Sequence, residues 1–443
     1  MGLVRETDLR PAAFHGPAGI QELFERLAER SSVQRVMEGE NLVGLASPEG
    51  ETLTLEPGGQ FELSTAPVST LQDLEDCVST KTARLACVAA KQGLLLIGGG
   101  MLPVGQDEAL WVPKSRYRVM RAHFAGLGQA GQLAPTMMQR TLSVQVTLDF
   151  LTPSQGAEML RLAFLAAPVA TAIFAASPLN GDQESRFQSM RAHAWLRTDP
   201  ARTGEILACT NEGSELVDYV RYALDVPVLF RQHGGDGLYR APEGRLRFRD
   251  VLEAGRWPDG SPLSVEDVRH HLSSVFTDAR LKPGTIELRS TDGQRPEDVM
   301  AIPAFWVGLL YDDDVRAEAI DLLAIVGDPA RNQARETVPA LALSALWGEA
   351  PVLGVARRLV DLARRGLERR VADGEERSGA VGFLTPVVRR LAEGRTPADE
   401  LLHSWRSEWG RERRNLVDAL RFRSEPAHPH CNGQPSRTMT EVA

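Results

Sequence analysis

Cysteine, long apolar runs and excess positive charge are all scarce in this chain of 443 residues. Its four cysteines contain no C-x-x-C pair, so the sequence predicts neither a disulfide framework nor a structural zinc site. The formal net charge is -9, which argues against the basic surface that nucleic-acid binding usually requires. We therefore expect no nucleic-acid partner.

Membrane and secretion signals are also lacking. No apolar run approaches the roughly 18 to 20 residues that cross a bilayer. The opening MGLVRETDLRPAAF has no apolar core of a signal peptide, and Glu6 stands where N-myristoylation needs Ser or Thr. These absences predict a cytoplasmic protein without a membrane partner, and they leave its oligomeric state open.

Apolar residues recur at helical spacing in several long stretches, and no low-complexity linker separates them. A polar, Pro-rich stretch follows at the end of the chain, and its composition is typical of disorder. We predict one folded domain over residues 1–423, with a helical C-terminal portion over about 315–423, and a disordered tail over 424–443. The helices are expected over residues 16–30, 68–92, 156–176 and 350–370, with a further one opening at Thr396-Pro397.

Strand candidates show a regular alternation of apolar and polar side chains. Successive side chains of a strand point to opposite faces, so alternation predicts which residues share a surface. The same rule, applied to RVMEGENL, places Glu38 and Glu40 on one face of a single strand. In the other three stretches the polar positions are Gln60, Glu62, Ser64, Ser143, Gln145, Thr147, Asp149, Thr285, Glu287 and Arg289.

Two interpretations of these polar faces remain open. An antiparallel sheet with one solvated face produces such alternation routinely. Lysine would then be expected among the polar positions, but they hold carboxylates, amides and hydroxyls with a single arginine. Hard oxygen donors of this kind suit Mg²⁺, which proteins commonly share with the phosphates of a nucleotide. A metal and nucleotide site is the sharper hypothesis.

The same stretches resemble a known family. Its most distinctive piece is EPGGQFELSTAP at 56–67, and the similarity runs in order from about residue 15 to 420. Further matching pieces are PTMMQRTLSVQVTLDF (135–150), SMRAHAWLRTDPARTG (189–204), HLSSVFTDARLKPGTIELRSTD (271–292), IPAFWVGLLYD (302–312) and GFLTPVVRRLAEGRTPADELL (382–402). Together they resemble the plant-type glutamate-cysteine ligases, a group shared by plants and many bacteria.

The resemblance implies a fold class and a reaction. The fold would be α+β and glutamine synthetase-like, with a curved, mainly antiparallel sheet, surrounding helices and a site on its concave face. The enzyme would be an ATP-dependent ligase that joins the γ-carboxylate of glutamate to the amine of cysteine through a γ-glutamyl phosphate. ATP and Mg²⁺ would be required, and the product would serve thiol biosynthesis, as in the glutathione or ergothioneine pathways.

The resemblance also carries roles onto residues. Arg289 would stabilise the charge of the transferred phosphoryl group, as an arginine finger does, and it would bind ATP together with Lys282. A salt bridge from Arg289 to Glu287 is the structural alternative, and ion pairing is the alternative for the other arginines. The implied metal ligands are Glu38, Glu40, Glu62, Gln145 and Glu287, with Glu56 a further candidate, and the implied substrate-binding residues are Arg191, Trp195, Arg116, Arg140 and Thr141.

Other functions remain open at this stage. A ligase of the same family could join glutamate, or a similar acid, to a different amine, and Gly39 and Asn41 depart from the usual family pattern beside the acceptor pocket. A non-catalytic binding protein and a glycosidase that uses two of the glutamates are alternatives from other classes. No G-x-x-x-x-G-K-[ST] motif is present, so ATP would have to be bound by metal and scattered side chains.

Overall fold

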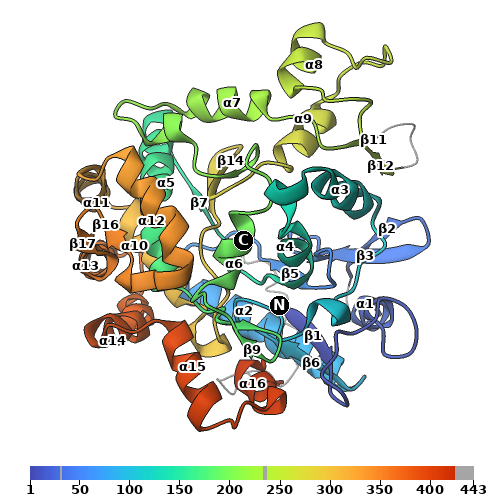
Figure 1. Cartoon of the computed structure of the whole chain (residues 1–443), viewed down its shortest axis with the longest axis horizontal. Helices are drawn as coiled ribbons and strands as arrows, with labels where there is room; N and C mark the ends of the chain where they lie inside the picture. Colours follow the sequence, from blue (N-terminus) through green and yellow to red (C-terminus); the bar gives the residue numbers. More distant parts are fainter. Residues whose placement is uncertain (30–31, 233–236, 425–443) are drawn as a thin grey trace, which may run out of the picture.

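The computed structural model describes residues 1–29, 32–232 and 237–424 (Figure 1). The predicted tail therefore lies, except for its first residue, outside the described residues. Helices and short strands alternate along the chain, which confirms the α+β class. The helices are α1 (Ile20–Ala28), α2 (Leu71–Ala90), α3 (Ser115–Gly126), α4 (Ala134–Arg140), α5 (Pro153–Ile173), α6 (Met190–Trp195), α7 (Leu216–Asp225), α8 (Phe248–Ala254), α9 (Val265–Leu272), α10 (Ala301–Leu310), α11 (Asp313–Ala324), α12 (Asp328–Leu341), α13 (Val352–Ala372), α14 (Thr385–Glu393), α15 (Pro397–Ser407) and α16 (Arg413–Leu420).

A four-stranded antiparallel sheet, in the order β2-β3-β4-β5, lies on one side of the molecule. Its strands are β2 (Gln34–Glu38), β3 (Asn41–Ala46), β4 (Thr52–Leu55) and β5 (Phe61–Ser64). Apolar residues of β3 and β5 pack with helix α1 in the core of this half. On β5 the polar side chains at positions 62 and 64 are exposed while Phe61 is buried, as the alternation predicted.

The expected single strand through Glu38 and Glu40 is wrong. β2 ends at Glu38, which pairs with Asn41 across a two-residue turn made by Gly39 and Glu40. Gly39 has a φ of +61°, a conformation that glycine adopts without steric cost and that tight hairpins favour. The two carboxylates therefore do not share one strand face.

A three-stranded antiparallel sheet forms the second surface, in the order β14-β15-β7. Its strands are β14 (Ala279–Lys282), β15 (Thr285–Leu288) and β7 (Val146–Asp149). The apolar side chains of β7 and β15 are buried in the main core, whereas Gln145 and residues 147 and 149 are exposed on the other side. The alternation predicted for these two stretches is confirmed.

The remaining strands form pairs, so the strands of the described residues belong to seven small sheets rather than to one continuous curved sheet. Most pairs are antiparallel, as expected, and β10 with β13 is parallel. Helices and loops are inserted between most strands, which are two to six residues long, and this limits how far any ladder extends. These other strands are β1 (Gly2–Arg5), β6 (Leu94–Ile97), β8 (Leu179–Asn180), β9 (Gln183–Glu184), β10 (Thr203–Gly204), β11 (Arg231–Gln232), β12 (Tyr239–Arg240), β13 (Phe276–Thr277), β16 (Leu346–Trp347) and β17 (Ala350–Pro351).

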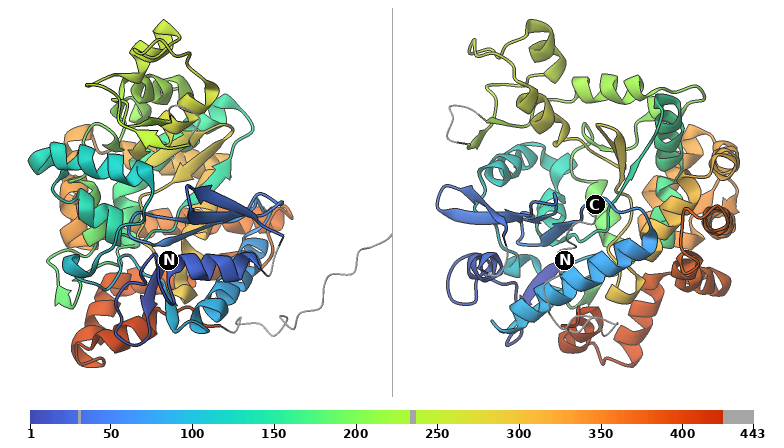
Figure 2. Two further views of the ribbon diagram at one scale, coloured as in Figure 1. Left: turned by 90° about the vertical axis from the view of Figure 1, so that its right-hand side faces the viewer. Right: turned by 180° about the vertical axis from the view of Figure 1, so that it is seen from behind.

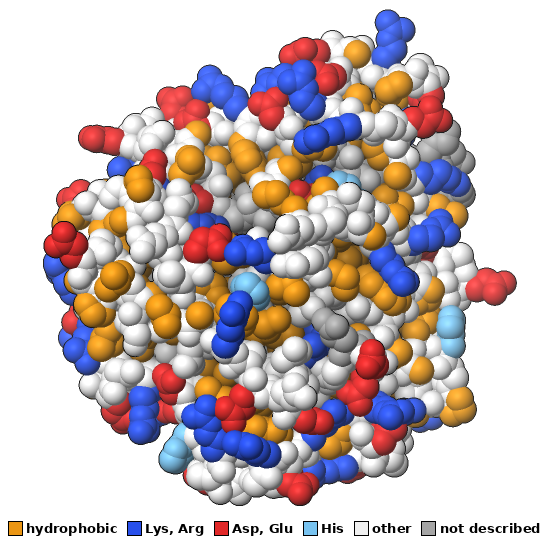
Figure 3. Space-filling model, in the orientation of Figure 1, with side chains coloured by type: hydrophobic (Ala, Val, Ile, Leu, Met, Phe, Trp, Pro, Cys, Tyr) orange, Lys and Arg blue, Asp and Glu red, His pale blue; other side chains and the backbone are white. Residues whose placement is uncertain are grey.

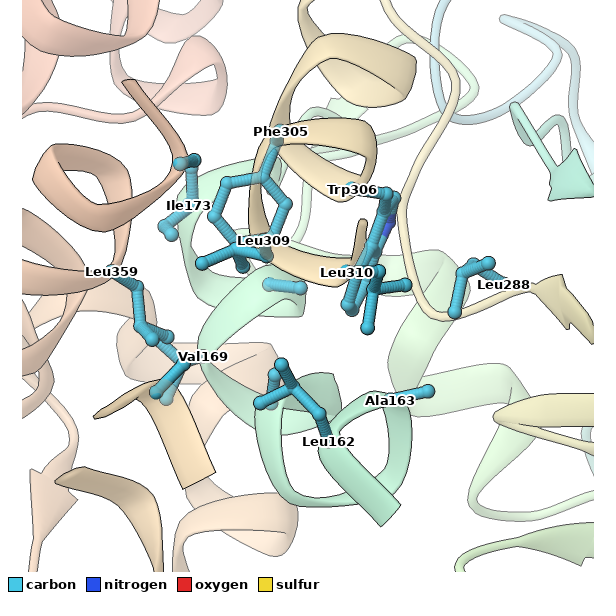
Figure 4. Packing of buried hydrophobic residues seen from close by; sticks show 14 of the residues in the cluster. Leu162, Ala163, Val169, Ile173, Leu288, Phe305, Trp306, Leu309, Leu310 and Leu359 are labelled. Atoms are coloured by element: carbon cyan, nitrogen blue, oxygen red, sulfur yellow. The ribbon is translucent and has the colours of Figure 1, made fainter. Parts of the chain in front are cut away.

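Helix α5 is the centre of the main hydrophobic core. It is apolar nearly all round, and α10, α11, α12 and α13 pack against or beside it. Its length and hydropathy meet the criteria for a membrane span, contrary to the sequence expectation, but 78% of the apolar window is buried inside the protein. Figure 4 shows Leu309 and Leu310 of α10 above Leu162 of α5, and Val169 of α5 beside Leu359 of α13. A buried core helix explains the apolar run.

The predicted helices are confirmed, with ends that differ by a few residues. α1 buries Ile20, Leu23, Phe24 and Leu27 on one face, as the spacing indicated. α15 begins after Thr396, whose side chain accepts a hydrogen bond from the Asp399 backbone N–H. In the view from behind in Figure 2, the long helix α2 crosses the lower half of the molecule.

Candidate functional site

Two carboxylates meet at the hairpin between β4 and β5. Glu56 follows β4, and Glu62 lies on β5 opposite Thr54, whose hydroxyl donates a hydrogen bond to it at 3.3 Å. Both carboxylates are accessible to water. Protein atoms nevertheless surround Glu56 closely enough that desolvation, followed by the charge and hydrogen bond of Glu62, raises the pKa of Glu56 to about 7. The negative charge of Glu62 therefore makes it harder for the neighbouring Glu56 to lose its proton.

Cationic side chains border this pair at the start of α3. The backbone N–H of Ser115 donates to the carboxylate of Glu38, which brings that glutamate to the helix N-terminus. Burial and the charge of Arg116 lower the pKa of Lys114, although Glu56 and Glu38 act in the opposite direction. The guanidinium of Arg116 lies over the ring of Phe230, 5.1 Å from its centroid.

A buried carboxylate with three cations occupies the second sheet. The Glu287 carboxylate lies 2.5 Å from Lys282 Nζ, 2.7 Å from Arg289 Nη1 and 3.2 Å from Arg280 Nη1. Burial alone would raise the pKa of Glu287, but the three cations outweigh it and hold that pKa well below its ordinary value. Arg289 Nη1 also donates to Gln145 Oε1 at 3.1 Å. The salt bridge between Arg289 and Glu287 is thus present.

The two groups are electrostatically connected. Burial lowers the pKa of Arg280 to about 10, and Glu62 is among the carboxylates that act against this shift. Figure 1 shows β14 and β5 near the middle of the molecule. Figure 3, in the same orientation, shows acidic, basic and histidine side chains gathered near the centre of this face. The interaction of Glu62 with Arg280 indicates that the polar sides of both sheets contribute to one charged region.

The residues at this region fit a divalent cation. Glu56 and Glu62 supply hard oxygen ligands, and a cation bound between them would offset the repulsion from Glu62 that adds to desolvation in raising the pKa of Glu56. Within the described ranges, no three Asp, Glu, His or Cys side chains are already grouped as a metal site. Of the predicted ligands, Glu62 lies with Glu56, Gln145 lies with Glu287, and Glu40 is exposed in its turn.

A cavity of about 330 Å³ lies beside the cationic group, bounded by helices α5, α6 and α12 and by strands β10 and β13. Arg191, Trp195 and Arg289 line it. Arg191 is 4% exposed, donates to the backbone carbonyl of Arg289 at 2.7 Å and leaves its buried Nε without a hydrogen bond. Trp195 Nε1 is likewise buried and unpaired. Two arginines and a tryptophan on the wall of a cavity of this size suit a small anionic ligand.

Three predicted substrate-binding residues lie away from the cavity, and one of them, Arg116, belongs to the cationic border of Glu56 and Glu62 described above. The other two are Arg140 and Thr141. Arg140 is 1% exposed and donates to Asn180, and Glu108 and Arg413 are the charges that act on it. Thr141 donates to the backbone carbonyl of Met137. Neither lines the cavity. That these two residues bind substrate therefore stays a prediction.

Some residues of the region were missed from the sequence. Arg280 precedes Lys282 by two positions on β14, so alternation on that strand would have placed it beside Glu287. Lys114 carried no such signal, because only the fold brings the start of α3 to the β4–β5 hairpin. Neither His270 nor His271 lines the cavity.

Carboxylates able to hold a divalent cation, a cluster of cations and an adjoining cavity of amino-acid size define an enzyme that acts on charged small molecules. Comparison with known proteins identifies the family. The family described as "Glutamate-cysteine ligase family 2" matches residues 2–419. The chain therefore belongs to glutamate-cysteine ligase family 2, and the predicted ligase class is confirmed.

Individual relatives agree with this assignment. The chain is 37% identical over 394 residues to the chloroplastic glutamate–cysteine ligase of Brassica juncea, covering 88% of this chain and 74% of that protein. The chloroplastic enzyme of Arabidopsis thaliana is also 37% identical, with 73% of its length covered. The Medicago truncatula enzyme is 34% identical over 421 residues, covering 94% of this chain and 78% of the relative. Membership favours the ligase over the glycosidase and binding-protein alternatives.

The predicted cytoplasmic location is wrong by the same comparison, because these relatives are named as chloroplastic enzymes. The sequence features behind that prediction concern a secretory signal, a membrane span and a lipid anchor. None of them bears on a plastid location.

Proposed function

We propose that this protein is an ATP-dependent glutamate-cysteine ligase that forms γ-glutamylcysteine through a γ-glutamyl phosphate, and that its charged region is a glutamine synthetase-like active centre. The observation that carries the proposal is the joining of two polar sheet surfaces, one with Glu56 and Glu62 and one with Glu287 and Arg289, in a member of this family. The product fits glutathione biosynthesis.

The chemistry accounts for the residue types. A carboxylate is a poor electrophile, so the γ-carboxylate of glutamate first takes the terminal phosphoryl group of ATP. Mg²⁺, held by Glu56, Glu62, Gln145 and Glu287 with Glu38 at the edge, would supply charge neutralisation at the phosphate oxygens. The guanidinium of Arg289 and the ammonium of Lys282 stabilise the negative charge that moves with the phosphoryl group.

Substrate positions follow from size and charge. The cavity of about 330 Å³ is at the small end of the range for ligand pockets and suits an amino acid better than a nucleotide. Glutamate binds there against Arg191 and Trp195, with its γ-carboxylate toward Arg289. ATP then lies along the carboxylates and cations of the two sheets. Arg116, held against Phe230 beside Lys114, adds positive charge at that end.

Oxygen tracing tests the phosphorylated intermediate. Glutamate labelled with ¹⁸O in its γ-carboxylate is incubated with the protein, ATP, Mg²⁺ and cysteine, and the inorganic phosphate is analysed by mass spectrometry. Transfer of one ¹⁸O atom to phosphate for each peptide bond formed is the expected result. Product formation without label in phosphate would contradict the acyl-phosphate route while leaving the ligase activity intact.

A further inference from the structure

One ion pair at the cavity wall leaves hydrogen-bonding groups of both partners unpaired. Arg335 of α12 and Asp278, which precedes β14, both line the cavity, and Arg335 Nη1 donates to Asp278 Oδ2. Among the described residues, this is the one hydrogen bond that either side chain makes. Arg335 therefore keeps Nε and Nη2 available, and Asp278 keeps Oδ1.

The other carboxylates of the cavity wall are committed to arginines. Glu336 binds the guanidinium of Arg197 with both oxygens, at 2.9 and 3.5 Å. Glu205 has a side chain only 4% exposed and pairs with Arg331 through one oxygen at 2.6 Å, while its other oxygen is buried without a hydrogen bond and is closed to a ligand. Asp278, at 23%, keeps both exposure and an unused oxygen. Of these carboxylates it is the best placed to receive a ligand.

The backbone holds the pair in place. The Asp278 N–H donates to the Gly204 carbonyl at 2.9 Å, and the Asp278 carbonyl accepts from the Arg289 N–H at 2.9 Å. A Cβ on Gly204 would lie 2.7 Å from Arg335 Nη2, and Gly204 has a φ of +89°, so a side chain is disfavoured there on both grounds. The free edge of the Arg335 guanidinium is thereby kept clear.

We propose that Arg335 and Asp278 recognise the acceptor amino acid, with Arg335 binding its α-carboxylate and Asp278 its α-amine. The inference rests on the proposed ligase function and deepens it, because it assigns the two side chains that hold the α-carboxylate and the α-amine of the acceptor. A free guanidinium edge beside a free carboxylate oxygen is complementary to the two charged groups that every α-amino acid carries on one carbon.

The acceptor is assigned to this pair, and the donor to Arg191, for a chemical reason. Donor glutamate presents its γ-carboxylate near Arg289, and Arg191 contacts the Arg289 backbone directly. The acceptor amine must lose a proton before it attacks, and a carboxylate next to it accepts that proton. The Asp278 oxygen serves this step, whereas the donor ammonium takes no part in the reaction.

The step balances as follows. The acceptor ammonium gives one proton to Asp278 and becomes a neutral amine. Its lone pair forms the C–N bond at the acyl carbon, and the C–O bond to phosphate breaks with its electron pair leaving on phosphate. The second amine proton goes to the departing phosphate, and Asp278 returns its proton to solvent.

Acceptor analogues test the pair in the unaltered protein. Cysteamine has the amine and thiol of cysteine but no carboxylate. With ATP, Mg²⁺ and glutamate, kcat/KM for cysteine should exceed that for cysteamine by at least about 100-fold, since an unpaired binding group rejects an analogue strongly. Equal use of cysteine and cysteamine would overturn the inference and leave the ligase function standing. If no γ-glutamyl product forms with cysteine either, the proposed function fails and the inference falls with it.

Variants then assign the effect to Arg335. Arg335→Gln should raise KM for cysteine about tenfold or more, leave KM for glutamate within twofold and leave kcat/KM for cysteamine unchanged. Arg335→Lys should recover part of the loss. The matched control is Arg197→Gln, which breaks the adjacent pair with Glu336 and should change neither KM. A rise in KM for glutamate alone would assign the pair to the donor and refute the inference. An equal loss of kcat/KM with cysteine and with cysteamine would also refute it. If Arg335→Gln does not fold, the comparison of cysteine with cysteamine in the unaltered protein still decides.

Discussion

Replacement of Glu287 by glutamine tests the organisation of the cationic group. The substitution keeps the shape of the side chain but removes the one negative charge that Arg280, Lys282 and Arg289 share. The Glu287 side chain is 7% exposed and those of Arg280 and Arg289 are 13% and 10% exposed, so water compensates poorly for its loss. Lys282 is 39% exposed and solvent screens its share.

The magnitude follows from the burial of the pair. Removing one partner of a buried ion pair costs about 3 to 5 kcal/mol, and we take about 3 kcal/mol because one of the three cations is screened. Urea unfolding at pH 7 measures the change. Glu318→Gln is the matched control, because it breaks an exposed ion pair. The side chain of Glu318 is 46% exposed and that of its partner Arg365 is 41% exposed, so the free energy of unfolding should fall by less than about 1 kcal/mol.

Activity should fall as well, by at least about 100-fold, because Arg289 loses the carboxylate that orients it. ADP release with ATP, Mg²⁺, glutamate and cysteine is the assay. A Glu287→Gln protein with the stability and turnover of the unaltered protein would refute the reasoning.

Three further changes test other parts of the structure. Gly366→Ala should destabilise by about 2 kcal/mol or more, because the new Cβ would meet a backbone oxygen of α10 at 1.9 Å, whereas Gly354→Ala on the same helix meets nothing within 4 Å and should stabilise slightly in thermal unfolding. Burial lowers the pKa of His271 to about 4, so as the pH falls the unfolded chain binds the His271 proton before the folded protein does. The free energy of unfolding should therefore fall by up to about 3 kcal/mol between pH 6.5 and 4. If urea unfolding of a His271→Gln variant shows the same dependence on pH as the unaltered protein, this reasoning is contradicted. Glu62→Gln should abolish turnover while Glu40→Gln keeps it within a few fold, and equal losses would show that the turn carboxylate is a ligand after all.

Alternation along a single strand predicted which side chains share a face. Glu287 and Arg289 lie together as the pattern required, because a strand fixes the face of every second residue, whereas the pairing of β7 with β15 that brings Gln145 to them was not part of the pattern. The same rule failed at Glu40, since it assumes that the strand continues. A glycine between two polar residues is compatible with a continuing strand and with a tight turn. The pairing of Glu38 with Asn41 shows that this chain turns.

Long-range neighbours could not be obtained in this way. Asp278 and Arg335 are 57 residues apart, on different elements, and no local pattern encodes the packing of α12 beside the start of β14. Arg140 lies within a stretch that resembles the family, and the sequence could not predict that its side chain is buried and bonded to Asn180. The small separate sheets were also unpredictable, because strand pairing depends on contacts that span the chain.

Formation of γ-glutamylcysteine is the measurement that tests the account most directly. Purified protein is incubated with ATP, Mg²⁺ and glutamate, with and without cysteine, while ADP release is followed and products are analysed by mass spectrometry. The account predicts that cysteine strongly stimulates ADP release and that one γ-glutamylcysteine forms for each ADP. ADP release that cysteine does not stimulate, with no γ-glutamylcysteine detected, would contradict it.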